Sequence, residues 1–170
     1  MFEWLRRLCC GSSTPVKPGT EIDLRAEGYS PQFVDKRVRD VRGTLIELRE
    51  HARVIADSGA DKGGHFDQAV HRTCTSVEKV LQNLKRDPDD FSRMGLALES
   101  LGPLNELVER CAHYAATGVE EGKLNRALNS GKEALAMTAQ KFEKLHNGPL
   151  QLDDELELKG LRKTVEDLNK

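Results

Sequence analysis

The strongest constraint on the fold is a pair of stretches in which an apolar residue recurs alternately four and three positions along the chain. This heptad pattern places apolar side chains along one face of an α-helix, and that face leaves water only by packing against other helices. The first stretch contains Val34, Val38, Val41, Leu45, Leu48, Ala52 and Ile55. The second, in a helix over 119–145, contains Leu124, Leu128, Gly131, Leu135, Thr138, Phe142 and Leu145. Two long amphipathic helices are predicted, with another helix close to Gly131.

Residues that begin and end helices predict the remaining elements. Ser30-Pro31 begins the first helix, and Asp87-Pro88 repeats this signal, since proline fits the first helical position. A helix over 65–86 has the apolar stripe Phe66, Val70, Cys74, Val77, Leu81 and Leu84. In the third helix we expect a kink or break at Gly102-Pro103, because proline lacks a backbone donor and clashes with the preceding turn. A last helix is expected to begin near Asp153 or Asp154.

These elements predict an all-α fold, an antiparallel up-down bundle of four to five helices. The chain has 170 residues, which suits one domain, and we place that domain at 30–170. Segment 1–20 is predicted to be a flexible tail, because its second half is rich in Gly, Ser and Pro.

Composition narrows the classes of partner. Charged residues make up 32% of the chain, yet the formal net charge is -2. The basic excess of a nucleic-acid-binding protein is therefore missing, and no nucleic-acid partner is expected. No apolar run approaches the roughly 20 residues that span a bilayer, and the first residues lack the apolar core of a signal peptide. We expect a cytoplasmic protein, with peripheral contact on the inner face of the membrane as an alternative.

The first ten residues contain a candidate membrane or partner docking segment. As a helix, this segment would have apolar residues on one side and two arginines on the other. The residues concerned are Phe2, Trp4, Leu5, Arg6, Arg7 and Leu8. Cys9 and Cys10 follow directly and are candidates for acylation. The alternative interpretation is a tail without fixed structure.

A basic group on the first helix is a second candidate site. Its members are Lys36, Arg37, Arg39 and Arg42. With Asp35 and Asp40 beside them, these residues are typical of a solvated helix face with ion pairs along the helix. The alternative is an anion-binding or lipid-binding patch.

Motifs for catalysis and cofactor binding were not found. None of the four cysteines has an arginine six positions later, as a cysteine phosphatase would require. A GxxxxGK[ST] phosphate loop and an HExxH zinc motif are also missing. Cys74 and Cys111 occupy apolar stripe positions and are interpreted as small buried thiols beside His71 and His113, with a zinc site as the minor alternative. No catalytic, cofactor or metal residue is assigned.

The order of several segments resembles a known family. The segments are 74–81, 86–91, the helix containing Pro103, 140–145 and 152–158. In this order they resemble the XpaC-like family, named for 5-bromo-4-chloroindolyl phosphate hydrolysis, over roughly 100 residues. The resemblance implies a helical fold and an association with TelA-like proteins of toxic-anion resistance. This chain departs from the family in lacking an N-terminal membrane hairpin, and leucines replace aromatic residues around Pro103. The resemblance supplies no catalytic residues.

Three functional hypotheses result. The first is a non-enzymatic helical bundle that acts through protein–protein contacts, at a membrane surface in one version, and in toxic-anion resistance or stress by family resemblance. The second, resting on the family name, is a phosphate-ester hydrolase. The third is an anion or lipid sensor that uses the basic group of the first helix.

Overall fold

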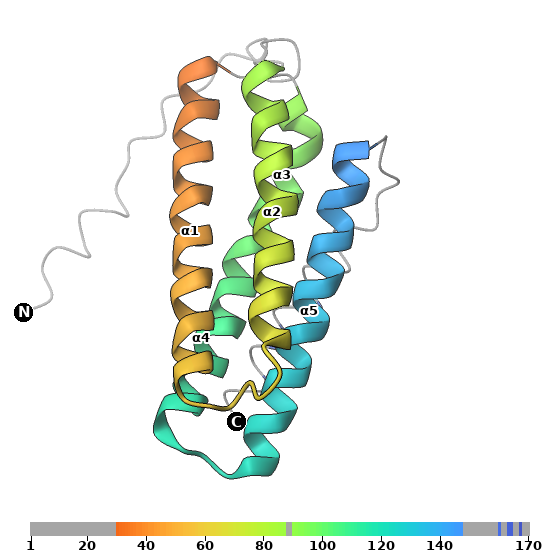
Figure 1. Ribbon diagram of the computed structural model, residues 1–170. Coiled ribbons are helices and arrows are strands. Elements are labelled where there is room, and N and C mark those ends of the chain that lie inside the picture. The colour runs from red at the N-terminus through yellow and green to blue at the C-terminus, as the bar shows by residue number, and fades with distance from the viewer. Residues whose placement is uncertain (1–29, 88–89, 148–159, 161–162, 165–166, 168–170) are drawn as a thin grey trace, which may run out of the picture.

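The computed structural model describes residues 30–87, 90–147, 160, 163–164 and 167. These residues are 89% helical and include no strand, which confirms the all-α class. The elements are α1 (Pro31–Asp57), α2 (His65–Arg86), α3 (Phe91–Glu99), α4 (Leu101–Thr117) and α5 (Glu121–Asn147), arranged as an elongated bundle (Figure 1).

The chain runs down and up the bundle in alternation, as predicted. The bundle has four arms, formed by α1, by α2, by α3 together with α4, and by α5. Consecutive arms are antiparallel, as in the pairs α1 with α2 and α4 with α5 (Figure 1). Among the described residues, however, the most extensive packing joins α2 to α5 and α1 to α4. The two helices of each of these pairs run in the same direction (Figure 1). The interface between α1 and α2 is less extensive.

The heptad positions form the core, as their spacing predicts. All seven positions in α1 are buried, and so are the six stripe positions of α2. In α5, Leu124 is only partly buried, because it lies in the first turn of the helix, and the other six positions are buried. Small residues between them, such as Ala127, Ala134 and Ala139, are buried as well. The core therefore extends beyond the predicted stripe where helices come close together.

Gly131 lies where three helices meet. A Cβ atom at this position would lie 2.9 Å from the ring of Phe66 in α2 and 3.1 Å from Sγ of Cys111 in α4. The prediction of a close helix approach at Gly131 is confirmed.

The helix ends follow local chemistry, with one correction. The start of α1 is confirmed, since the side chain of Ser30 accepts a hydrogen bond of 3.2 Å from the amide of Phe33. Asp87 ends α2 in an extended conformation, which both N-cap residues and residues before proline adopt, and its carbonyl accepts a hydrogen bond of 3.3 Å from the amide of Asp90. Pro88 and Asp89 lie outside the described residues. Helix α3 begins at Phe91. Helix α5 begins at Glu121, two residues after the predicted start.

The third arm bends next to its proline. Helices α3 and α4 meet at Ser100, with a bend of 18°. Pro103 cannot donate a hydrogen bond to the carbonyl of Glu99, and its ring crowds that carbonyl. The predicted kink is therefore found one turn before the proline, while the apolar stripe continues through Leu98, Leu101 and Leu104, all buried.

Several predictions lie outside the described residues. These are the tail over 1–20 with its docking residues, Cys9 and Cys10, and the start of the last helix at Asp153 or Asp154.

Candidate binding groove between α1 and α2

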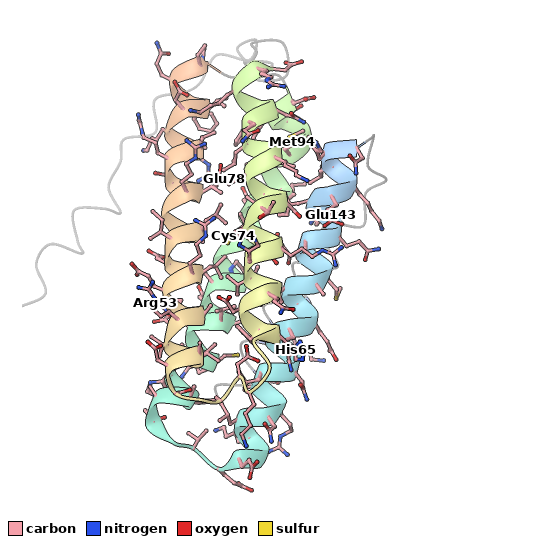
Figure 2. The ribbon with its side chains drawn as sticks, viewed as in Figure 1. Arg53, His65, Cys74, Glu78, Met94 and Glu143 are labelled. Carbon is pink, nitrogen blue, oxygen red and sulfur yellow. The ribbon has the colours of Figure 1, made fainter. Side chains whose placement is uncertain are left out.

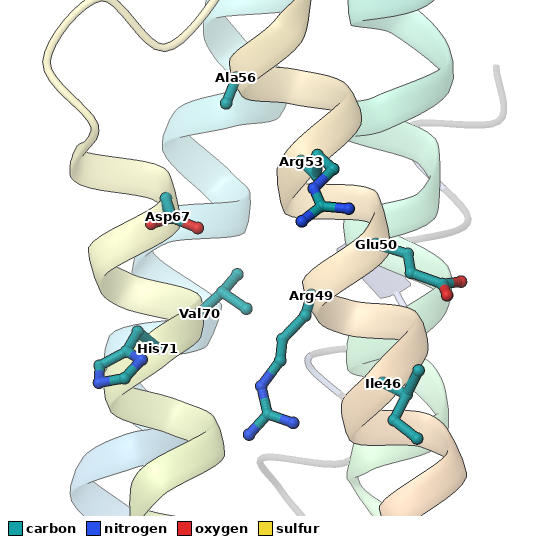
Figure 3. A pocket seen from close by; sticks show the side chains of 8 residues that line it. All are labelled: Ile46, Arg49, Glu50, Arg53, Ala56, Asp67, Val70 and His71. Atoms are coloured by element: carbon teal, nitrogen blue, oxygen red, sulfur yellow. The ribbon is translucent and has the colours of Figure 1, made fainter.

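A groove of about 470 Å³ opens along the interface between α1 and α2. It lies between the second half of α1 and the first half of α2 (Figure 3). The residues that line it are Ile46, Arg49, Glu50, Arg53, Ala56, Asp67, Val70 and His71. Five of these eight side chains are charged or titratable, so the groove is a polar surface with an apolar floor.

The antiparallel register determines which residues face each other. Arg42 of α1 forms an ion pair of 3.2 Å with Glu78 of α2. Seven residues further along α1 and seven back along α2 are Arg49 and His71. The next step of four residues in each direction reaches Arg53 and Asp67. An arginine therefore recurs on the α1 side, while the α2 side changes from Glu to His to Asp.

The charged residues that line the groove are two arginines, Arg49 and Arg53, and two carboxylates, Glu50 and Asp67. The side chain of Arg49 points toward the space between the helices, Arg53 lies in front of α1, and Glu50 points away from α2 (Figure 3). Within the described part of the chain, neither arginine forms an ion pair or a side-chain hydrogen bond. Asp67 is the carboxylate that α2 supplies to the lining, and in this register it stands opposite Arg53.

The thiol of Cys74 lies beneath this surface, on the buried side of α2. Figure 2 shows Cys74 below Glu78 along α2, with Arg53 on the neighbouring α1. Burial raises the pKa of Cys74, and the positive charge of Arg49 partly offsets this effect.

Both described cysteines are buried free thiols, as the stripe positions predict. Burial raises the pKa of Cys111 to about 12, and its Sγ donates a hydrogen bond of 3.3 Å to the carbonyl of Ala127. A thiol with a raised pKa stays protonated at neutral pH and is a poor nucleophile and metal ligand. In the described residues, no group of three His, Cys, Asp or Glu side chains could hold a metal ion.

The four residues of the predicted basic group on α1 differ in burial and in ion pairing. Lys36 and Arg39 are exposed, whereas Arg37 is partly buried. Arg42 is also partly buried, and its guanidinium is bound to Glu78 at 3.2 Å. Arg42 therefore stabilises the α1–α2 interface and is not available to an external anion in this arrangement.

The sequence interpretation missed Arg49 and Arg53. Their spacing of four residues places them on one side of a helix, and this signal was present. Their relation to His71 and Asp67 depends on the register between two helices, which no local pattern specifies. His71 was considered only with Cys74, but Cys74 points into the core and His71 is exposed.

Comparisons with protein-family models, curated proteins and solved structures find no match for this chain. The resemblance to the XpaC-like family therefore stays a prediction. Among the described helices, none combines the length and apolar character needed to cross a bilayer.

Proposed function

We propose that the chain is a non-enzymatic interaction protein that docks a protein partner on the outer face of α1, the face formed by Ile46, Glu50 and Val54. The observation that supports it is the exposure of Ile46 and Val54, 54% and 42% respectively. Both lie on the side of α1 opposite its buried heptad positions. Large apolar residues in this position stabilise a complex by leaving water, and Glu50 between them supplies a charged contact that favours one orientation of the partner.

The partner implied by the family resemblance is a TelA-like protein, and the docking proposal is tested with it directly. A photoreactive benzoylphenylalanine replaces Ile46 in one variant and Met137 in a control variant. Met137 is a matched control because it is 55% exposed but lies on α5. After co-expression and illumination, we expect a covalent adduct with the TelA-like protein from position 46 and not from position 137. Equal adducts at both positions, or none at position 46, would contradict docking on the outer face.

A second measurement tests the energetic role of the apolar pair. The double variant Ile46→Asp with Val54→Asp should weaken binding to the TelA-like protein at least tenfold, because each aspartate would have to lose water in the interface. Met137→Asp should leave the affinity unchanged. Circular dichroism of each variant verifies that the helices are retained.

The hydrolase hypothesis is tested by a separate assay. Purified full-length protein is incubated with 5-bromo-4-chloroindolyl phosphate, and product is followed over time. Turnover that a point substitution abolishes, with the fold retained, would overturn the non-enzymatic proposal.

A further inference from the structure

Two other arginines of this bundle, Arg42 and Arg72, form ion pairs between neighbouring helices. Arg42 of α1 binds Glu78 of α2 at 3.2 Å. Arg72 of α2 binds both carboxylate oxygens of Glu143 in α5, each at 3.0 Å, and Ser76 donates to the same carboxylate. The hydrogen bond from Arg72 lowers the pKa of Glu143, as expected for a carboxylate held in its charged form. In both places, a neighbouring helix supplies an oxyanion to the guanidinium.

In the groove between α1 and α2, the neighbouring helix does not supply such a carboxylate to Arg49. At the level where a carboxylate would face Arg49, the α2 residue is His71, which has no oxyanion. Arg53, one turn further along, lines the same groove and forms no ion pair within the described chain. Two guanidinium groups therefore border a space that has room for a small anion.

We propose that this groove binds inorganic phosphate or a phosphomonoester through Arg49, Arg53 and His71. Arginines four residues apart on a helix are neighbours, and their planar forks can each donate two hydrogen bonds to one tetrahedral oxyanion. His71 lines the groove from the second helix, with its ring turned away from α1 in Figure 3, and rotation of this ring toward Arg49 would add an N–H donor. This binding function goes beyond the docking proposed for the outer face of α1, with which the groove shares Ile46 and Glu50 at its edge.

Asp67 would make the site prefer phosphate over sulfate. Its carboxylate lines the groove beside these cations and would repel a fully deprotonated anion such as sulfate. Phosphate near neutral pH keeps one hydroxyl group, which can donate a hydrogen bond to Asp67 while the other oxygens face Arg49 and Arg53. Glu50, the second carboxylate of the lining, points away from α2 (Figure 3), so two arginines, a histidine and Asp67 are left to favour phosphate over sulfate.

The test measures phosphate binding by the full-length protein at constant ionic strength. The readout is the NMR signal of the arginine Nε–H groups and of the His71 ring during titration with inorganic phosphate. We expect saturable shifts at Arg49, Arg53 and His71, and weaker binding of sulfate. In the double variant Arg49→Gln with Arg53→Gln, the affinity should fall at least tenfold.

Two variants make the result specific. Arg39→Gln is the matched control, because Arg39 is an exposed arginine on the same helix outside the groove. It should leave phosphate affinity unchanged. Asp67→Asn should reduce the preference for phosphate over sulfate by removing the repelling charge. Shifts that grow linearly without saturation, or an equal loss of affinity in Arg39→Gln, would overturn the proposal.

A vesicle experiment separates free phosphate from a lipid headgroup. Phosphatidic acid presents the same phosphomonoester on a membrane, so vesicles of phosphatidic acid in phosphatidylcholine are compared with pure phosphatidylcholine. The protein should bind soluble phosphate with the groove intact and lose this binding in the double variant. Vesicle binding that depends on Arg49 and Arg53, without any binding of soluble phosphate, would overturn the assignment to a free ligand.

Discussion

Single positions in this core tolerate little change, and Gly131 is the most constrained of them. It occupies a heptad position of α5 because the ring of Phe66 and the thiol of Cys111 leave no space for a side chain. The sequence pattern alone predicted this, since a glycine among leucines at a repeat position costs helix stability unless packing requires it.

Replacing Gly131 by alanine should destabilise the protein, against the usual effect of this substitution in a helix. The new methyl carbon would lie 2.9 Å from the Phe66 ring, so core side chains must shift, and we expect a loss of about 1–3 kcal/mol. Gly43 is the control, because it is helical and a Cβ there would meet nothing within 4 Å. Gly43→Ala should stabilise by roughly 0.5–1 kcal/mol. Urea unfolding of both variants measures the difference, and a stabilising Gly131→Ala would disprove the close contact.

The thiol of Cys111 should make stability depend on alkaline pH. Its pKa is raised by burial from 9.0 to about 12 in the folded protein. Between these two values, the unfolded chain loses the thiol proton and the folded chain keeps it, so the free energy of unfolding falls as pH rises. Urea unfolding at pH 8 and pH 10.5 measures this fall. Cys111→Ser should show a smaller decrease over the same interval, and an identical decrease would exclude Cys111 as its cause.

At the scale of the helix, sequence periodicity predicts which face is buried but not which helix covers it. All predicted core positions of α1 and α2 are buried, because each helix is packed along its length. The buried face of α2 also includes Thr73, Ser76 and Val80, which the predicted stripe did not contain. The pairing of α2 with α5 was not predicted, since a short loop restricts only the order of helices along the chain. The groove residues Arg49 and His71 depend on inter-helix register, which local patterns do not specify either.

Truncation of one buried leucine in each of three helices tests the heptad assignment. Leu45, Leu81 and Leu135 are all fully buried. Each change to alanine should cost about 2–5 kcal/mol, from lost burial and the remaining cavity. Ile46→Ala is the control, because Ile46 is next to Leu45 but 54% exposed. Thermal and urea unfolding measure both, and a cost for Ile46→Ala as large as for Leu45→Ala would contradict the assignment of faces.

At the scale of the whole molecule, the described helices already form a complete core of their own. The buried residues of α1, α2, α4 and α5 make one continuous apolar cluster. Within the described part of the chain, this cluster has aliphatic residues from every arm and includes the fully buried rings of Phe66 and Phe142. The bundle is therefore expected to be stable without the first twenty residues.

Deleting residues 1–20 should leave the melting temperature nearly unchanged and reduce membrane or partner association. The removed segment contains Trp4, Leu5 and Leu8 on one predicted helical side, and Arg6 and Arg7 on the other. Each arginine near an anionic surface contributes roughly 1 kcal/mol to binding. Flotation with anionic vesicles compares the two chains, and the fluorescence of Trp4 should shift to the blue in the full-length protein. Equal flotation without a shift would remove the membrane interpretation, and a large drop in melting temperature would show that the tail packs on the bundle.

The parallel pairing of α2 with α5 has a consequence for the order of folding. Arg72 and Glu143, which connect these helices, are 71 positions apart in the chain. An isolated hairpin of α1 and α2 forms only one of the smaller interfaces, so most of its apolar surface is still in water until the second hairpin arrives. We expect the rate-limiting event to be the docking of two nascent hairpins, and therefore slower folding than in a bundle whose contacts are mainly local. Amide hydrogens of α2 and α5 should then become protected from exchange at the same time, rather than one hairpin after the other.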